Sequence, residues 1–221
     1  VLTSLASAEP VKVNALNFAR AETDVYFARL LQQSGGLSKF HHIREPAPID
    51  KQDVIRMNRD TLYSSAIFDL DAGPVTLTLP DAGSRFMSLL IVNQDHYATD
   101  TLYAPAAKTF TRQSVGTRYF AALVRTFMNP ADAGDVKAAH AAQDKVSIEQ
   151  AGAGTFDVPD WDEATHKKTR DLLIELNAMG GTKDNRFGRK EDVDTISWLL
   201  GTATGWGGNP PKDAIYFPVY P

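Results

Sequence analysis

Residues 73–97, GPVTLTLPDAGSRFMSLLIVNQDHY, contain two strand patterns of different periodicity, separated by a turn. In the first pattern, Val75, Leu77 and Leu79 alternate with threonines between two prolines, which is typical of a strand with one buried and one exposed face. In the second, residues 86–92 are apolar at odd and even positions apart from one serine, as expected of a strand covered on both faces. Two strands joined by a tight turn, with no helix between them, favour an antiparallel sheet.

Similar patterns extend this sheet along the chain in both directions. Residues 62–68 and 118–127 are rich in apolar and aromatic side chains, so each is predicted to be a strand. Residues 14–33 carry apolar side chains at helical spacing and end before Gly35 and Gly36, which predicts a helix.

The charged side chains of this first helix, Arg20, Glu22 and Asp24, are interpreted as its solvent-exposed face. Residues 41–53 are predicted to be a loop, because two prolines interrupt them.

Helical patterns return after Pro130. Residues 135–146 and 192–200 are predicted short helices, and a longer helix is predicted to begin at Asp160, which has capping-box spacing to Glu163. We expect this longer helix to present one apolar stripe, made of Leu172, Leu173, Leu176 and Met179.

Together these patterns predict an α+β fold: an antiparallel β-sandwich-like core with an N-terminal helix and a C-terminal helical region. We divide the chain into an N-terminal helix and loop that pack on the sheet (residues 1–55), an antiparallel β domain (56–128) and a helical region that ends in a strand (129–221). Two explanations stay open for the strand pattern at residues 215–220, namely an edge strand or the end of a truncated chain.

Composition limits the classes of function. Of the 221 residues, 43% are hydrophobic and 23% are charged, which is typical of a globular protein with a buried core. The net charge of −4 gives no reason to expect nucleic acid as a partner, and no apolar run is long enough for a membrane span. The absence of cysteine excludes disulfides, thiolate catalysis and cysteine-bound zinc. No metal site and no cofactor are predicted.

Residues 6–8, Ala-Ser-Ala, have the small-x-small pattern of a signal-peptidase cleavage site, and only five residues precede them. Both the remnant of a removed leader and a frayed end rich in small residues explain this pattern.

Polar side chains gather at the ends of two predicted strands. Asn58, Arg59 and Asp60 precede the first strand, and Asp95 and His96 follow the apolar central one. If these two strands are antiparallel neighbours, the start of one meets the end of the other, and the polar groups share one rim of the sheet. The sequence therefore predicts a ligand-binding or catalytic site at that rim.

In the catalytic interpretation, Asp95 or His96 acts as acid or base, Tyr63 donates a hydrogen bond, and Arg59 or Arg85 anchors an anionic group. The predicted ligand-binding residues are Asn58, Arg59, Asp60, Arg85 and Trp206. Each of these residues also has an ordinary structural explanation, such as a rim ion pair, a turn, or packing at the edge of the core.

Residues 57–97, which include NRDTLYSS at 58–65, resemble the signature of the domain-of-unknown-function 1254 family of bacterial proteins, many of them exported. The similarity extends along most of the chain, to ARAETDVYFA (19–28), VGTRYFAALVRT (115–126), FDVPDWDEAT (156–165) and GTATGWGGNPPKDAIYFPV (201–219). The resemblance implies an antiparallel β-sandwich with added helices, a periplasmic or secreted location after removal of a leader, and a second all-β module that follows in relatives. The family has no firmly established activity.

Two functions remain open. The first is an exported bacterial enzyme, or enzyme fragment, that acts on a small polar or anionic organic molecule. The alternative is a non-catalytic ligand-binding or scaffold module of the cell envelope. The predicted partners are a small-molecule ligand and either a second copy in a homo-oligomer or a C-terminal β module that this chain lacks.

Overall fold

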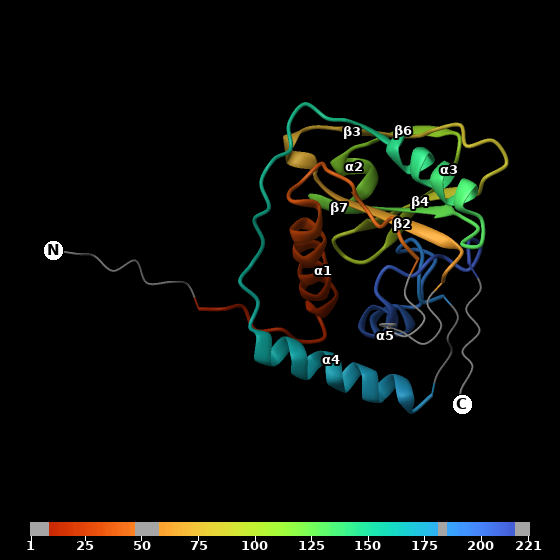
Figure 1. The fold of residues 1–221 in the computed structure, drawn as a ribbon. Helices are drawn as coiled ribbons and strands as arrows, with labels where there is room; N and C mark the ends of the chain where they lie inside the picture. The colour runs from red at the N-terminus through yellow and green to blue at the C-terminus, as the bar shows by residue number, and fades with distance from the viewer. Residues whose placement is uncertain (1–8, 47–57, 181–184, 215–221) are drawn as a thin grey trace.

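The structure is a computed structural model that describes residues 9–46, 58–180 and 185–214. Its centre is an antiparallel five-stranded sheet with the strand order β1-β2-β7-β4-β5 (Figure 1). In that order the strands are His41–His42, Thr61–Asp69, Tyr119–Phe127, Met87–Asn93 and Ala98–Tyr103. All seven positions of β4 are buried, as its unbroken apolar pattern predicts. The strands expected at residues 62–68, 86–92 and 118–127 are confirmed.

A smaller antiparallel sheet, with the order β6-β3-β8, lies on one face of the larger one. Its strands are Ala106–Phe110, Val75–Leu79 and Ser147–Glu149. Burial alternates along β3 as predicted, and its inner side chains join those of β4 and β7 in one hydrophobic cluster. The strands β5, β6 and β8 were not predicted, because they are largely polar and half-exposed and so lack a periodic apolar signal.

Helices α1, α4 and α5 lie on the opposite side of the five-stranded sheet, so the molecule has three layers, whereas α2 and α3 lie on the side of the small sheet (Figure 1). α1, Phe18–Ser34, packs Phe27 against Ile67, Leu90 and Ala121 of the sheet. It ends at Gly35, whose φ of 71° is the left-handed conformation that glycine adopts readily. With α1 on one face and the small sheet on the other, β4 is covered on both sides, which explains its continuous apolar sequence. The α+β class is confirmed.

Of the remaining helices, α3, α4 and α5 follow the predicted order with shifted ends, whereas α2 and a 3-10 helix were not predicted. The helices are α2 (Arg112–Val115), α3 (Ala133–Asp144), α4 (Glu163–Ala178) and α5 (Thr195–Gly205), and the short 3-10 helix spans Leu70–Ala72. The capping residue of α4 is Asp162, which accepts a hydrogen bond from the Thr165 amide at 2.8 Å, and not Asp160 as predicted. Asp160 instead accepts a backbone hydrogen bond from Val11 in an isolated bridge.

The apolar stripe predicted for α4 is wrong. Leu173 is buried, but Leu172 and Leu176 are about half-exposed and Met179 is 84% exposed. The inward face of α4 carries His166 as well as Leu173, because α4 packs against α1 through buried polar contacts. Polar pairing, rather than apolar periodicity, therefore orients this helix.

Two further predictions concern the segment after α1 and the strand pattern at residues 215–220. His41 and His42, predicted to start a loop, pair with Ser65 and Ser64 as the short edge strand β1. Residues 47–53 of that loop and the strand pattern at 215–220 lie outside the described residues. Strands β1 and β8 come from outside residues 56–128, and the division into domains stays a prediction. Within the described residues, no helix combines the length and apolar character that crossing a membrane requires.

Candidate functional site

The two groups of predicted site residues lie at opposite ends of the sheet. β7 lies between β2 and β4, so these two strands run in the same direction. Phe120 of β7 pairs with Phe68 at the end of β2 and with Asn93 at the end of β4. Asp60, before the start of β2, is therefore separated from Asp95 by the length of a nine-residue strand, roughly 25 Å. The predicted common rim does not exist.

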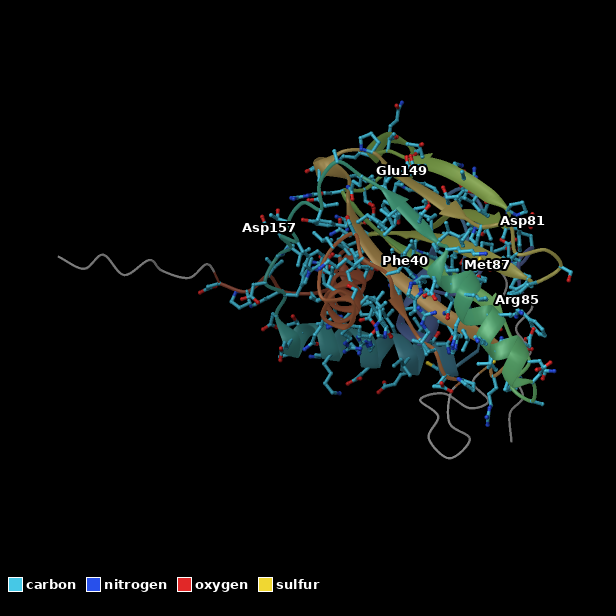
Figure 2. The ribbon with its side chains drawn as sticks, turned by 45° about the horizontal axis from the view of Figure 1, so that its top comes forward. Phe40, Asp81, Arg85, Met87, Glu149 and Asp157 are labelled. Carbon is cyan, nitrogen blue, oxygen red and sulfur yellow. The ribbon has the colours of Figure 1, made fainter. Side chains whose placement is uncertain are left out.

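At the Asp60 end, the predicted ligand-binding residues bind mostly to the protein itself. Asn58 donates to the Thr61 hydroxyl at 3.0 Å, and that hydroxyl donates to the Asp60 carboxylate at 2.9 Å. Arg85 lies beside α3 (Figure 2), where its guanidinium holds the Asp135 carboxylate at 2.6 and 3.2 Å. Only Arg59 makes no hydrogen bond or ion pair with the described residues.

His96 is built into the structure as a neutral side chain. It is 3% exposed and has a φ of 62°, which is unusual for any residue except glycine. The Gly207 amide donates to Nε2 at 2.8 Å, so the proton lies on Nδ1 and is donated to the Thr202 hydroxyl at 2.8 Å. Burial lowers the pKa of His96 to about 3. This geometry favours a structural role for His96 over the predicted acid–base role.

Trp206 packs beside His96 at the edge of the core. Its ring stacks on Tyr26 with 4.4 Å between ring centroids, and it lies 5.6 Å from the His96 ring. The indole N–H donates to the Thr23 hydroxyl of α1 at 3.1 Å. The packing explanation for Trp206 is therefore favoured over ligand binding.

Of the three charged residues of α1 that were interpreted as a solvent-exposed face, Arg20 is 38% exposed, but Glu22 and Asp24 are buried. Glu22 and Asp24 are each 1% exposed. Glu22 accepts hydrogen bonds from His166 at 2.7 Å and from Arg170 Nε at 3.0 Å. Asp24 accepts from Gln94 at 2.6 Å and from the Trp161 indole at 3.0 Å, and burial raises its pKa. We call the four buried polar residues Glu22, Thr23, Asp24 and His96 the α1 hub.

Asp95 precedes His96 in the turn between β4 and β5, and a cleft opens beside it. Both Arg20 Nε and a terminal nitrogen of Arg20 donate to Asp95 Oδ1, at 2.8 and 2.5 Å. Asn93 shapes the turn, because its Oδ1 accepts from the amides of Asp95 and Tyr97. The cleft has a volume of about 490 Å³ and lies between this turn, β5, β6, α2 and residues 189–191. We call it the β4–β5 cleft.

The walls of the β4–β5 cleft are polar and balanced in charge. Asp100 forms an ion pair with Lys108, and the Thr99 hydroxyl is buried without a hydrogen-bond partner among the described residues. Burial and the charge of Asp95 raise the pKa of Tyr97, so its phenol stays protonated at neutral pH. The charged lining residues are the acids Asp95, Asp100 and Glu191 and the bases Lys108, Arg189 and Lys190. Among the described residues, no group of three or more histidine and acidic side chains could hold a metal ion.

Tyr63, the third predicted catalytic residue, lies far from this cleft, near the start of β2 and on the side of the sheet that faces α1. Its register partner on β7 is Arg125, which in turn pairs with Ser88 of β4, and Ser88 pairs with Tyr103 of β5. Residues directly opposite each other point to the same face, so these four form one row. Arg125 was missed by the prediction, although an arginine within the apolar pattern of residues 118–127 is an available signal.

Comparisons with known proteins agree with the fold and leave the activity open. Residues 37–103 match the family model described as "Protein of unknown function (DUF1254)", which confirms the predicted resemblance over that range. The VPA0106 protein from Vibrio parahaemolyticus, a structural genomics target, has a similar structure with a TM-score of 0.67 and 17% sequence identity. The similarity covers 89% of this chain and 66% of that one, so this chain spans less than two thirds of the longer protein. No curated protein matches the sequence.

Proposed function

We propose that the protein binds a small polyhydroxylated organic molecule in the β4–β5 cleft. The observation that carries this proposal is the Thr99 hydroxyl, which lies in the cleft wall, is buried, and has no hydrogen-bond partner among the described residues. Buried polar atoms in native proteins are nearly always paired with protein or with a bound molecule, so an unpaired one in a cleft wall points to a missing partner.

The acids of the cleft favour a ligand that donates hydrogen bonds. Arg20 binds only Oδ1 of Asp95, and Lys108 binds only Oδ2 of Asp100. Each carboxylate therefore keeps one oxygen that no described residue occupies. An ionised carboxylate can only accept, so the matching ligand groups are hydroxyls or other donors.

The bases of the cleft allow the same ligand to carry a negative charge. Arg189 and Lys190 are exposed beside Glu191, and no ion pair joins either base to a described residue. They support binding of a polyol that bears an acidic group, such as a sugar acid, more strongly than binding of a cationic one.

Binding is favoured over catalysis because the predicted acid–base pair is not assembled. His96 is buried with both ring nitrogens hydrogen-bonded, and Asp95 is held by Arg20. Asp95 and Asp100 each form an ion pair with a base of the protein, Arg20 and Lys108 respectively.

A calorimetric titration of the protein with neutral sugars, sugar acids and inositol tests this function. Thr99→Val keeps the shape of the side chain and removes the hydroxyl, and Asp100→Asn removes the charge. We expect each variant to bind the active compound about 10-fold more weakly. Asp171→Asn, at an exposed carboxylate paired with Lys167 on α4, is the matched control and should bind normally.

Two results would contradict the proposal. The first is a compound that binds wild type, Thr99→Val and Asp100→Asn equally well. The second is the absence of heat from every compound in the panel at millimolar concentration, with the protein shown to be folded by circular dichroism.

We also propose a periplasmic or secreted location, which the resemblance to exported proteins supports. Osmotic-shock fractionation of the source bacterium with an antibody to this chain tests it, and recovery with the spheroplast contents alone would contradict it.

A further inference from the structure

Arg125 carries a charge that the described protein does not neutralise. The side chain is half-buried on β7, and its Nε is fully buried without a hydrogen-bond partner. No described carboxylate forms an ion pair with it, and its guanidinium lies over the Phe86 ring, with Cζ 5.8 Å from the ring centroid. A half-buried guanidinium without a counter-ion costs folding free energy, because its charge and its five N–H donors lose water without gaining acceptors.

Aromatic rings surround this guanidinium on the same face of the sheet. Tyr63, Phe86, Tyr103 and Phe127 are between 37 and 46% exposed. The rings of Phe86 and Tyr103 meet edge to face, with 6.0 Å between their centroids. We call these four rings, together with Arg125 and Ser88, the Arg125 face. Large exposed rings gathered on one surface are typical of a binding site rather than of free surface.

An acidic side chain, Asp213, lies beside this face and binds Tyr103. The Tyr103 hydroxyl donates to Asp213 Oδ1 at 2.7 Å. Burial, together with the hydrogen bond and charge of Asp213, raises the pKa of Tyr103 to about 12, so the phenol remains a donor at neutral pH. Asp213 therefore binds Tyr103 through Oδ1, its Oδ2 is buried without a hydrogen-bond partner among the described residues, and no ion pair joins Asp213 to Arg125.

We propose that the Arg125 face binds an organic carboxylate with an aromatic body. The planar guanidinium matches the two oxygens of a carboxylate, and the surrounding rings match a flat apolar body. Arg125 places a single guanidinium among these rings, which suits one carboxylate better than a doubly charged phosphate.

This site is separate from the β4–β5 cleft. Arg125 pairs with Ser88 near the start of β4, whereas the cleft begins at Asn93 at its end, roughly 15 Å further along the strand. The two proposals can therefore fail independently, and the cleft variant Asp100→Asn should leave ligand binding at the Arg125 face unchanged.

The test is a titration followed by nuclear magnetic resonance, with benzoate as the probe. Benzamide, which has the same ring without the charge, and inorganic phosphate are the comparison ligands. We expect benzoate to shift the resonances of Arg125 and of the neighbouring tyrosines, with affinity reduced at least 10-fold for benzamide and for phosphate.

Variants of two arginines separate a specific site from general attraction. Arg125→Met keeps an apolar stem and should lower benzoate affinity at least 10-fold, and Arg125→Lys should lower it to an intermediate value because the fork geometry is lost. Arg29→Met is the matched control, because Arg29 is an exposed arginine stacked 5.5 Å from the Tyr26 ring, and it should bind benzoate as wild type does.

Equal benzoate affinity in wild type and Arg125→Met would overturn the proposal, and so would the absence of resonance shifts at tens of millimolar benzoate. Phosphate binding that is as tight as benzoate binding and equally dependent on Arg125 would overturn the assignment of an aromatic carboxylate. If Arg125→Met does not fold, Arg125→Lys and the benzamide comparison still decide the outcome.

Discussion

The α1 hub and the Arg125 face are both polar clusters on the helix side of the same sheet, but they satisfy their polar groups in opposite ways. In the hub, the carboxylates of Glu22 and Asp24 each accept at least two hydrogen bonds, and both ring nitrogens of His96 are engaged. On the Arg125 face, the guanidinium has no hydrogen bond or ion pair with any described residue.

The contrast distinguishes polar groups that are paired within the protein from a charged group that we propose binds a ligand. The hub residues have partners from α4, from α5 and the loop after it, and from the turn after β4, so they tie three separate parts of the chain to α1. The Arg125 side chain forms no hydrogen bond or ion pair with the part of the chain that the structure describes. We therefore expect substitutions in the hub to change stability and substitutions on the Arg125 face to change binding.

The largest effect is expected at Glu22. Glu22→Ala leaves Arg170 and His166 beside a buried cavity without their shared acceptor, and we expect a loss of roughly 3 kcal/mol or more in the free energy of unfolding. Urea unfolding followed by circular dichroism measures it. Glu175→Ala, at an exposed acid of α4, should change stability by less than about 0.5 kcal/mol. A loss below about 1 kcal/mol for Glu22→Ala would remove the distinction between the two regions.

A smaller effect is expected from acidification, through His96. Its pKa falls from 6.5 to about 3 on folding, so the unfolded state binds more protons between these values. The contribution of His96 to stability is then complete above pH 6.5 and is lost as the pH falls toward 3, at a limiting slope of roughly 1.4 kcal/mol per pH unit.

His96→Asn isolates this term, because asparagine tolerates the left-handed backbone and does not titrate. Urea unfolding between pH 7 and 4 should show a steeper loss of stability for wild type than for the variant. Other titrating groups, including the buried Asp24, are common to both proteins and cancel in the difference. Identical slopes would mean that His96 is protonated in the folded protein.

The smallest effect on stability is expected at Arg125. Arg125→Met removes an uncompensated charge and keeps an apolar stem against Phe86, so stability should change by less than about 1 kcal/mol or should rise. Thermal unfolding of the variant and of Arg29→Met measures this. A loss comparable to that of Glu22→Ala would show that the fold depends on the guanidinium, and the Arg125 face would then resemble the hub.

Local sequence patterns predicted the main strands and helices, but they did not predict which polar residues lie close together. The strands around β4 were predicted because apolar periodicity depends only on nearby residues, and the end of α1 was predicted because Gly35 adopts a left-handed backbone. Predicting the site would have required knowledge of which strands are neighbours in the sheet. β7 lies between β2 and β4 even though it follows both in the chain. That insertion carried Asp60 and Asp95 to opposite ends of the sheet.

The amino-acid sequence by itself determined the α+β class, the main strands, the helix order and the resemblance to a family of unknown function. Only the tertiary structure decided that Glu22 and Asp24 are buried, that His96 is held neutral, and that the Arg125 guanidinium has no ion-pair partner among the described residues. The physical reason is that a polar side chain is neutralised by groups distant in sequence: 144 residues separate Glu22 from His166, and 111 separate His96 from Gly207. Periodicity carries no information about such pairs. Only the folded structure shows which polar side chains have a hydrogen-bonding or ionic partner.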